Sequence, residues 1–122
     1  MVQSFRDLVV WQKAMKLTVQ VYQLTREFPR EEIYGLSSQM RRSAVSIPSN
    51  IAEGTGRSKT PELRQFLNIA RGSNCELQTQ LIIAKELKFA NPDRLEEAEQ
   101  LTHEVGKMIF TMLAKLNQPA AH

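Results

Sequence analysis

The sequence of 122 residues contains one cysteine and two histidines, which leaves few groups for metal binding or nucleophilic catalysis. A single cysteine excludes an internal disulfide and a zinc site made of several cysteines. A di-iron site in a helical bundle needs a Glu-x-x-His motif on each of two helices. Here Glu99 and His103 are four residues apart, and the other histidine is the terminal His122. We therefore expect no metal site and interpret His103 as a helix-surface residue.

Cys75 is the remaining candidate for catalysis, and no histidine lies near it in the chain. A cysteine nucleophile needs an oriented base beside it. We therefore expect Cys75 to be a small buried thiol on the third helix. No cofactor and no enzymatic activity are expected.

Long hydrophobic runs are also absent. The longest stretch without a charged side chain is the ten residues Ser43–Ala52, whereas a membrane-spanning helix needs about 18 or more apolar residues. The N-terminus contains no apolar signal region, so we expect a cytoplasmic, unprocessed protein with no membrane partner. At about 100–200 residues per domain, the length predicts one domain, 1–118, followed by a short tail, 119–122.

Glycine and proline are scarce, with five of each, and most lie where helices would begin or end. They divide the chain into four segments with helical spacing of apolar residues: about Phe5–Glu27, about Glu31–Glu53, Thr60 onward, and Asn91 to Leu116. Ser4, Thr60 and Asn91 are typical N-cap residues. No run alternates as a strand would. Four helices joined by short loops predict an all-α, antiparallel up-down-up-down four-helix bundle.

Pro48 lies inside the pattern of the second segment, where it removes a backbone donor. We expect a kink or brief break of the helix near Ser46–Ser49. Ser49 and Asn50 could pair the backbone groups that the proline frees. Gly54 is expected to end this helix.

Apolar residues of the third segment recur at alternating spacings of four and three, which is typical of a bundle seam. They are Leu63, Leu67, Ala70, Leu77, Leu81 and Ala84, with Asn74 as a buried hydrogen-bonding member. The first segment has two apolar lines: Val10, Ala14, Leu17, Val21 and Leu24, and beside them Trp11, Met15, Thr18 and Tyr22. The fourth segment has a similar double set. The second line belongs either to a wide core or to a surface for self-association.

The charges are unevenly distributed. Residues 1–71 hold 11 basic and 6 acidic side chains, a net charge of +5, while 72–122 hold 5 and 7, a net charge of −2. The cations between 41 and 71 are Arg41, Arg42, Arg57, Lys59, Arg64 and Arg71. Arginine suits bidentate phosphate contacts, and such clustering is typical of nucleic-acid binding. The sequence offers no clear aromatic stacking platform among them, so a solvated or salt-bridged face is the alternative.

The segment Gly54–Thr60 combines two glycines, two cations and the start of the third helix. It lacks the glycine before Lys-Ser/Thr and the leading strand of a phosphate loop. Free backbone donors at a helix N-terminus still favour anions. An anion site and a solvated loop are therefore both open.

Several runs of the sequence carry a resemblance to a known family: Phe5–Leu8, Val10–Ala14, Tyr34–Leu36, Gln39–Gly54, Gly56–Arg57, Phe66–Ala70, Gly72–Ser73, Glu76–Leu77 and Gln80–Leu81. These runs resemble the bacterial four-helix bundle family, also called the 23S rRNA intervening-sequence protein or S23 ribosomal protein family. The resemblance covers about residues 4–90, and its most specific part is Ile-Pro-Ser-Asn-Ile-Ala-Glu-Gly at 47–54. The fourth segment matches in pattern only, and Cys75 is not typical of the family.

The resemblance implies a cytoplasmic bacterial bundle that assembles as a homopentamer. It also implies kinship with the accessory variability protein of diversity-generating retroelements, a basic pentameric barrel that works with a reverse transcriptase and nucleic acid. The cations inside the matching runs are Arg41, Arg42 and Arg57, which are our candidate nucleic-acid contacts.

The leading hypothesis is a non-enzymatic homo-oligomeric scaffold, expected to be pentameric, that binds RNA or DNA through the second helix and the loop after it. The alternative is a protein-interaction module without nucleic-acid binding. Such a module would dock a partner protein, for example a reverse transcriptase, through its apolar outer helix face.

Overall fold

Four α-helices make up most of residues 4–117, the part of the chain that the computed structural model describes. They are α1 (Val9–Thr25), α2 (Leu36–Thr55), α3 (Thr60–Glu86) and α4 (Pro92–Leu116). Two short 3-10 turns, η1 (Phe5–Asp7) and η2 (Arg30–Glu32), precede α1 and α2. The described residues contain no strand, which confirms the predicted all-α class.

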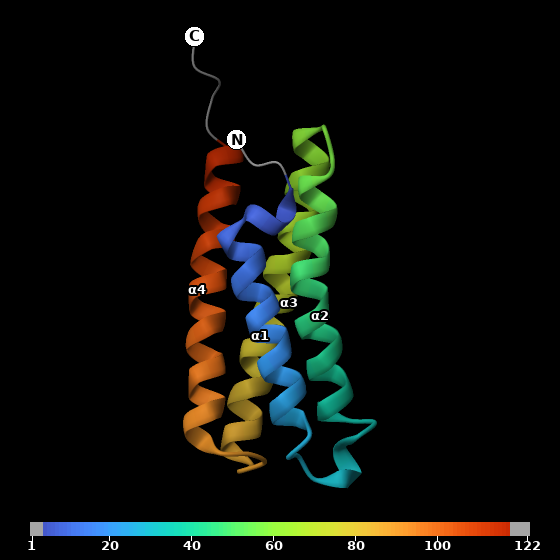
Figure 1. Ribbon diagram of the computed structural model, residues 1–122, viewed down its shortest axis with the longest axis vertical. Helices are drawn as coiled ribbons and strands as arrows, with labels where there is room; N and C mark the ends of the chain where they lie inside the picture. Colours follow the sequence, from blue (N-terminus) through green and yellow to red (C-terminus); the bar gives the residue numbers. More distant parts are fainter. Residues whose placement is uncertain (1–3, 118–122) are drawn as a thin grey trace.

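The helices run alternately up and down, as predicted for a bundle with short connections (Figure 1). Each helix packs against two neighbours, in the order α1, α2, α3, α4 and back to α1. The α2–α3 pair packs most extensively and the α1–α4 pair least. No helix within residues 4–117 has the length and hydropathy needed to cross a bilayer. The predicted tail, 119–122, lies outside the described residues.

The core consists of one apolar stripe from each helix. In α1 the first predicted line is buried in full: Val10, Ala14, Leu17, Val21 and Leu24. The second line lies at the surface, where Met15 and Tyr22 are exposed and Trp11 is half-buried. The core therefore does not use both lines, and apolar area of α1 remains on the outside of the bundle.

The predicted start of α4 is confirmed, because Asn91 Oδ1 accepts hydrogen bonds from the backbone N–H groups of Asp93 (2.9 Å) and Arg94 (3.1 Å). The predicted starts of the first two helices are too early. Ser4 caps η1 rather than α1, and α1 begins only at Val9. Likewise, η2 and a turn occupy the residues before Leu36. Short 3-10 turns often precede helices, and their apolar spacing over three residues resembles that of an α-helix.

The chain passes through Pro48 without interrupting α2, so of the two predicted alternatives near residues 46–49, a kink or a brief break, the break does not occur. Proline lacks a backbone N–H, and the carbonyl of Ala44, four residues earlier, therefore loses its partner within the helix. Thr18 Oγ1 of α1 lies 3.0 Å from this carbonyl oxygen and 2.8 Å from the carbonyl oxygen of Ala14. The Thr18 hydroxyl thus satisfies the group that the proline frees.

Ser49 and Asn50 do not have this role, contrary to the prediction. The Asn50 side-chain amide donates to the carbonyl of Ser46 at 2.8 Å, and Ser49 is exposed. The freed carbonyl is paired by the neighbouring helix instead of by residues beside the proline.

Gly54 does not end α2, which continues to Thr55. The glycine is buried in the last turn, and a Cβ there would lie 2.9 Å from Phe66 Cβ and 3.1 Å from Leu63 Cδ1 of α3. Gly54 is therefore needed for the close approach of α2 and α3 at this end of the bundle.

Candidate nucleic-acid interface

The three candidate arginines lie at two separate places on the bundle. Arg41 and Arg42 are in the first half of α2, whereas Arg57 follows its C-terminal end. At a rise of about 1.5 Å per residue, the helix between Arg42 and Arg57 spans about 22 Å. The fold therefore brings two of the predicted contacts together and leaves the third at the far end.

Arg41 is held in place by α1. Its Nε donates to Thr25 Oγ1 at 2.8 Å, and its guanidinium carbon lies 4.9 Å from the centre of the Tyr22 ring. The hydrogen bond and the cation–π contact fix the plane of the guanidinium. The residue as a whole is partly exposed.

Arg42 is exposed on the adjacent face of α2. No hydrogen bond or ion pair from residues 4–117 engages its guanidinium. A free arginine beside a fixed one gives this part of α2 one adaptable and one preorganised phosphate donor.

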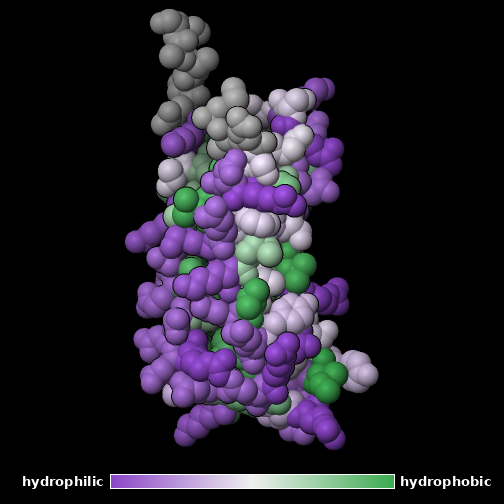
Figure 2. Space-filling view, in the orientation of Figure 1, coloured by the Kyte–Doolittle hydropathy of each residue, from purple (hydrophilic) through white to green (hydrophobic). Residues whose placement is uncertain are grey.

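The two arginines line a groove of about 630 Å³ together with aromatic side chains. We call it the Arg41–Tyr34 groove; its lining residues are Tyr22, Ile33, Tyr34, Ser38, Arg41, Arg42, Val45 and Ser46. Tyr34 is 96% exposed. The lining contains no carboxylate, so nothing in it cancels the positive charge. The face shown in Figure 2 is mostly hydrophilic, with hydrophobic patches scattered over it.

Aromatic residues do accompany the cations, which corrects the sequence interpretation. Tyr22 comes from α1, 19 residues before Arg41, and Tyr34 comes from the turn before α2, seven residues before Arg41. Antiparallel packing of α1 on α2 brings Tyr22 to Arg41. The sequence signal for Tyr22 was its position on the second apolar line of α1, which places it on the outside of the bundle.

Arg57 is paired with acidic side chains on both sides. It lies 2.8 Å from a carboxylate oxygen of Glu53 and 3.9 Å from one of Glu62, and its guanidinium carbon lies 5.2 Å from the Phe66 ring centre. A phosphate would have to compete with these carboxylates. Arg57 is thus salt-bridged, which was the alternative to nucleic-acid binding stated for the arginine cluster.

Arg64 caps the C-terminal end of α4, because its Nη2 donates to the carbonyl of Leu116 at 3.2 Å. A cation at the C-terminus of a helix pairs the last carbonyl groups. Arg64 therefore does not add to the Arg41–Tyr34 groove.

Cys75 is exposed, and the prediction of a buried thiol is wrong. Its neighbour Asn74 is buried and donates from its side-chain amide to the carbonyl of Thr102 at 2.9 Å, as predicted. His103 is exposed, which confirms its interpretation as a helix-surface residue.

The comparison with protein families gives one match: the sequence model described as 23S rRNA-intervening sequence protein covers residues 6–111. Among curated proteins, none matches significantly. A solved structure from Bacteroides thetaiotaomicron, of a protein of unknown function from the S23 ribosomal protein family, is similar with a TM-score of 0.77. The two sequences are 21% identical over 86% of this chain and 98% of that one, so the likeness shows a shared fold.

Proposed function

Since the chain belongs to the 23S rRNA-intervening sequence protein family, we propose that it is a non-enzymatic scaffold of identical copies that binds RNA or DNA. The observation that carries the proposal is the Arg41–Tyr34 groove, which combines two arginines, two tyrosines and no carboxylate. Of the three candidate contacts, Arg41 and Arg42 are the principal ones. Arg57 contributes least, because acidic side chains already pair its charge.

The groove chemistry favours a single strand. Phosphates pair with Arg42 and with the free N–H groups of Arg41, while an unstacked base packs on the exposed ring of Tyr34. Base stacking on an aromatic side chain contributes about 1–3 kcal/mol per base and tolerates any sequence. The two arginines and Tyr34 lie on one face of α2 and its preceding turn, so one short strand can contact all three at once.

Self-association is supported by apolar surface between α1 and α4, the least tightly packed pair of helices. A groove of about 340 Å³ there is lined mainly by Leu8, Val9, Val10, Met108 and Met112. A second copy would cover this apolar area, and the family resemblance implies five copies. Repetition of the Arg41–Tyr34 groove around such an assembly would raise its affinity for a long strand.

The second candidate function is docking of a different protein, for example a reverse transcriptase, on the same apolar groove between α1 and α4. The observation that favours it is the apolar lining itself, which fits any hydrophobic partner. It predicts a complex that is insensitive to salt and a protein with little affinity for RNA.

The experiment that tests the proposal is fluorescence anisotropy with a labelled single-stranded RNA over a series of salt concentrations. Arg42→Ala should weaken binding and reduce the slope of log K against log salt by about one, because one phosphate contact is lost. Tyr34→Ala should weaken binding without changing the slope, because stacking releases no counterion.

Arg57→Ala is the matched control, since it removes an exposed arginine whose charge is already paired. It should leave the affinity and slope near those of the unmodified protein. Unchanged binding of Arg42→Ala, or a larger loss in Arg57→Ala than in Arg42→Ala, would contradict the assignment to this groove.

A further inference from the structure

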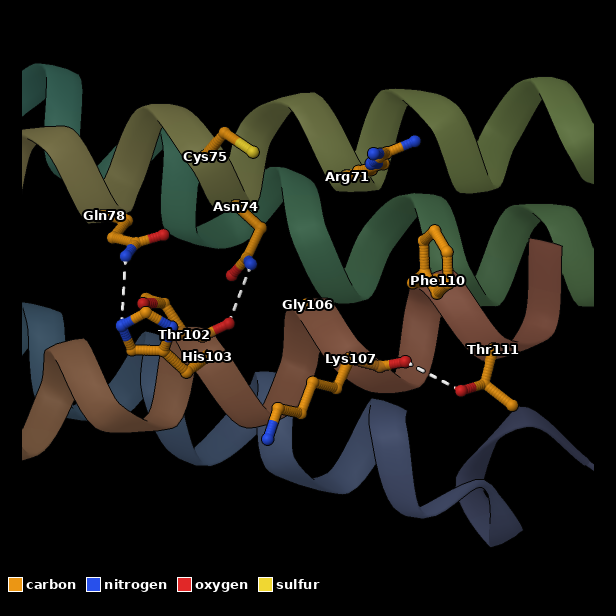
Figure 3. Close-up of a pocket in the computed structure, with 10 residues that line it drawn as sticks. All are labelled: Arg71, Asn74, Cys75, Gln78, Thr102, His103, Gly106, Lys107, Phe110 and Thr111. Carbon is orange, nitrogen blue, oxygen red and sulfur yellow. Dashed lines mark hydrogen bonds between the residues drawn. The ribbon is translucent and has the colours of Figure 1, made fainter. Parts of the chain in front are cut away.

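A second site lies on the opposite side of the bundle, in the crevice between α3 and α4 (Figure 3). The crevice has a volume of about 460 Å³, within the range of small-molecule sites. Figure 3 shows Gln78 and His103 at one end, Asn74 in the middle, and Arg71 and Phe110 at the other end. None of these residues belongs to the Arg41–Tyr34 groove.

The floor of the crevice contains a buried acceptor. Asn74 is 3% exposed, and its Nδ2 is used by the carbonyl of Thr102. Its Oδ1 is buried and has no hydrogen-bond partner among residues 4–117. Buried polar atoms are nearly always paired, so this oxygen calls for an N–H or O–H donor from outside the chain.

Gly106 leaves room for this amide between α3 and α4. A Cβ at position 106 would lie 3.2 Å from Asn74 Nδ2, so any larger residue would press on the side chain that forms the floor. The glycine is half-buried in the middle of α4. Glycine is unfavourable in a helix interior, and room beside Asn74 gives a physical reason for it here.

One end of the crevice is positively charged. Arg71 lines it there, and the lining contains no carboxylate. Lys107 also lines the crevice, but its side chain extends toward α1 (Figure 3). A smaller crevice of about 200 Å³ continues from Arg71 and Phe110 to Arg64, again without a carboxylate in its lining.

An aromatic ring lies beside the charge. Phe110 is 59% exposed, and the guanidinium carbon of Arg71 lies 5.9 Å from its ring centre. Arg71 and Asn74 are one helical turn apart on α3, which places their Cβ atoms about 5–6 Å apart. One small molecule or one terminal group is therefore long enough to reach both residues.

We propose that the α3–α4 crevice binds a nucleoside 5′-phosphate group, either as a free mononucleotide or at the end of a strand. Arg71 pairs with the phosphate. The nucleoside lies against Phe110, and one of its hydroxyl or amino groups donates to Asn74 Oδ1. Gln78 and His103 form the polar end of the site, where their Nε2 atoms are 3.2 Å apart.

The test is isothermal titration calorimetry of the full chain with AMP, inorganic phosphate and adenosine as probes. AMP should bind with a dissociation constant below about 1 mM, and each of the two fragments should bind at least about tenfold more weakly. A 5′-phosphorylated dinucleotide that binds more tightly than AMP would identify the end of a strand as the source of the group, and the reverse order would identify the free nucleotide.

Two variants separate the two contacts. Arg71→Gln should weaken AMP and phosphate alike by about tenfold, because it removes the charge but keeps the polar length of the side chain. Gly106→Ala should weaken AMP and leave phosphate unchanged, because it disturbs only the Asn74 floor. Arg26→Gln, which removes an exposed arginine at the C-terminal end of α1, is the control and should change neither.

Absence of AMP binding at about 5 mM would overturn the proposal, as would equal affinity of AMP for the unmodified protein and for Arg71→Gln. These results are independent of the RNA anisotropy experiment, because Arg42 and Tyr34 are unchanged in all of these variants.

Discussion

The Thr18 hydroxyl substitutes for the backbone amide that Pro48 cannot provide, since it donates to the carbonyl of Ala44 in the next helix. We expect Thr18→Val to lower the free energy of unfolding by about 1–3 kcal/mol, because it leaves a partly buried carbonyl without a partner at nearly constant side-chain volume. Urea denaturation followed by circular dichroism measures this change.

A second substitution tests whether the loss is due to the proline. In Pro48→Ala the new amide at position 48 can donate to Ala44, so the Thr18 hydroxyl is no longer required there. Thr18→Val should then lower the free energy of unfolding clearly less in the Pro48→Ala background than in the original protein. An equal cost in both backgrounds would show that the Thr18–Ala44 hydrogen bond does not compensate for Pro48.

Two adjacent residues show what the sequence can predict about single positions. Asn74 continues a seam of spacings four and three, so its burial was predictable from periodicity. Cys75 is one position farther around the helix, which turns it by about 100° and exposes it. The buried thiol was inferred from the lack of a catalytic partner, and the position of Cys75 in the helical period was not used.

Between α2 and α3, one glycine sets the distance at the end where the helices meet. Gly54→Ala should destabilise the protein by about 1–3 kcal/mol, because its Cβ would come within 2.9 Å of Phe66 Cβ and force the two helices apart. Thermal unfolding monitored by circular dichroism should show the lower midpoint.

Gly72→Ala is the matched control for this prediction. Gly72 is exposed inside α3, and a Cβ there would meet nothing within 4 Å. Alanine is favoured over glycine in a helix interior by about 0.5–1 kcal/mol, so this variant should be more stable than the original protein. Destabilisation of similar size in both variants would contradict the close-packing role of Gly54.

The starts of α3 and α4 were predictable and those of α1 and α2 were not. At α3, Thr60 is the first helical residue rather than the predicted N-cap, and Lys59 before it makes no side-chain cap hydrogen bond. The helix α4 begins after Asn91 because the side-chain oxygen of Asn91 accepts hydrogen bonds from two backbone amides of the first turn. The starts of α1 and α2 were missed because each follows a 3-10 turn. Leu8 and Gly35, which precede these helices, make no side-chain cap hydrogen bond that the sequence could reveal.

For the whole molecule, the fold followed from the sequence more completely than the candidate site did. Apolar periodicity and short connections were enough to predict four antiparallel helices. The arginines were identified from their clustering, but the tyrosines were not. Packing of α1 on α2 brings Tyr22 to Arg41, and the turn before α2 brings Tyr34 into the same groove. The charge pairing of Arg57 with Glu53 and Glu62 likewise depends on local geometry.

Assembly is the property that the exposed apolar surface of the whole molecule predicts. Val9 lines the groove between α1 and α4 and is 52% exposed, and Val19 is also 52% exposed but does not line that groove. Light scattering should give a multiple of the monomer mass for the original protein, and five copies if the family resemblance holds.

Val9→Glu should lower that mass, because a charge in the groove opposes burial against a second copy. The helix itself should tolerate the change, since Val9 is the first residue of α1 and a carboxylate there interacts favourably with the helix dipole. Val19→Glu introduces the same charge on the same helix and should leave the mass unchanged. A monomer mass for the original protein at micromolar concentration, or an equal loss of mass in both variants, would show that this groove does not join the copies. If the groove between α1 and α4 does not join copies, it is free to bind a different protein. A complex with such a protein that is insensitive to salt and is lost in Val9→Glu would then favour the docking function over the self-assembled scaffold.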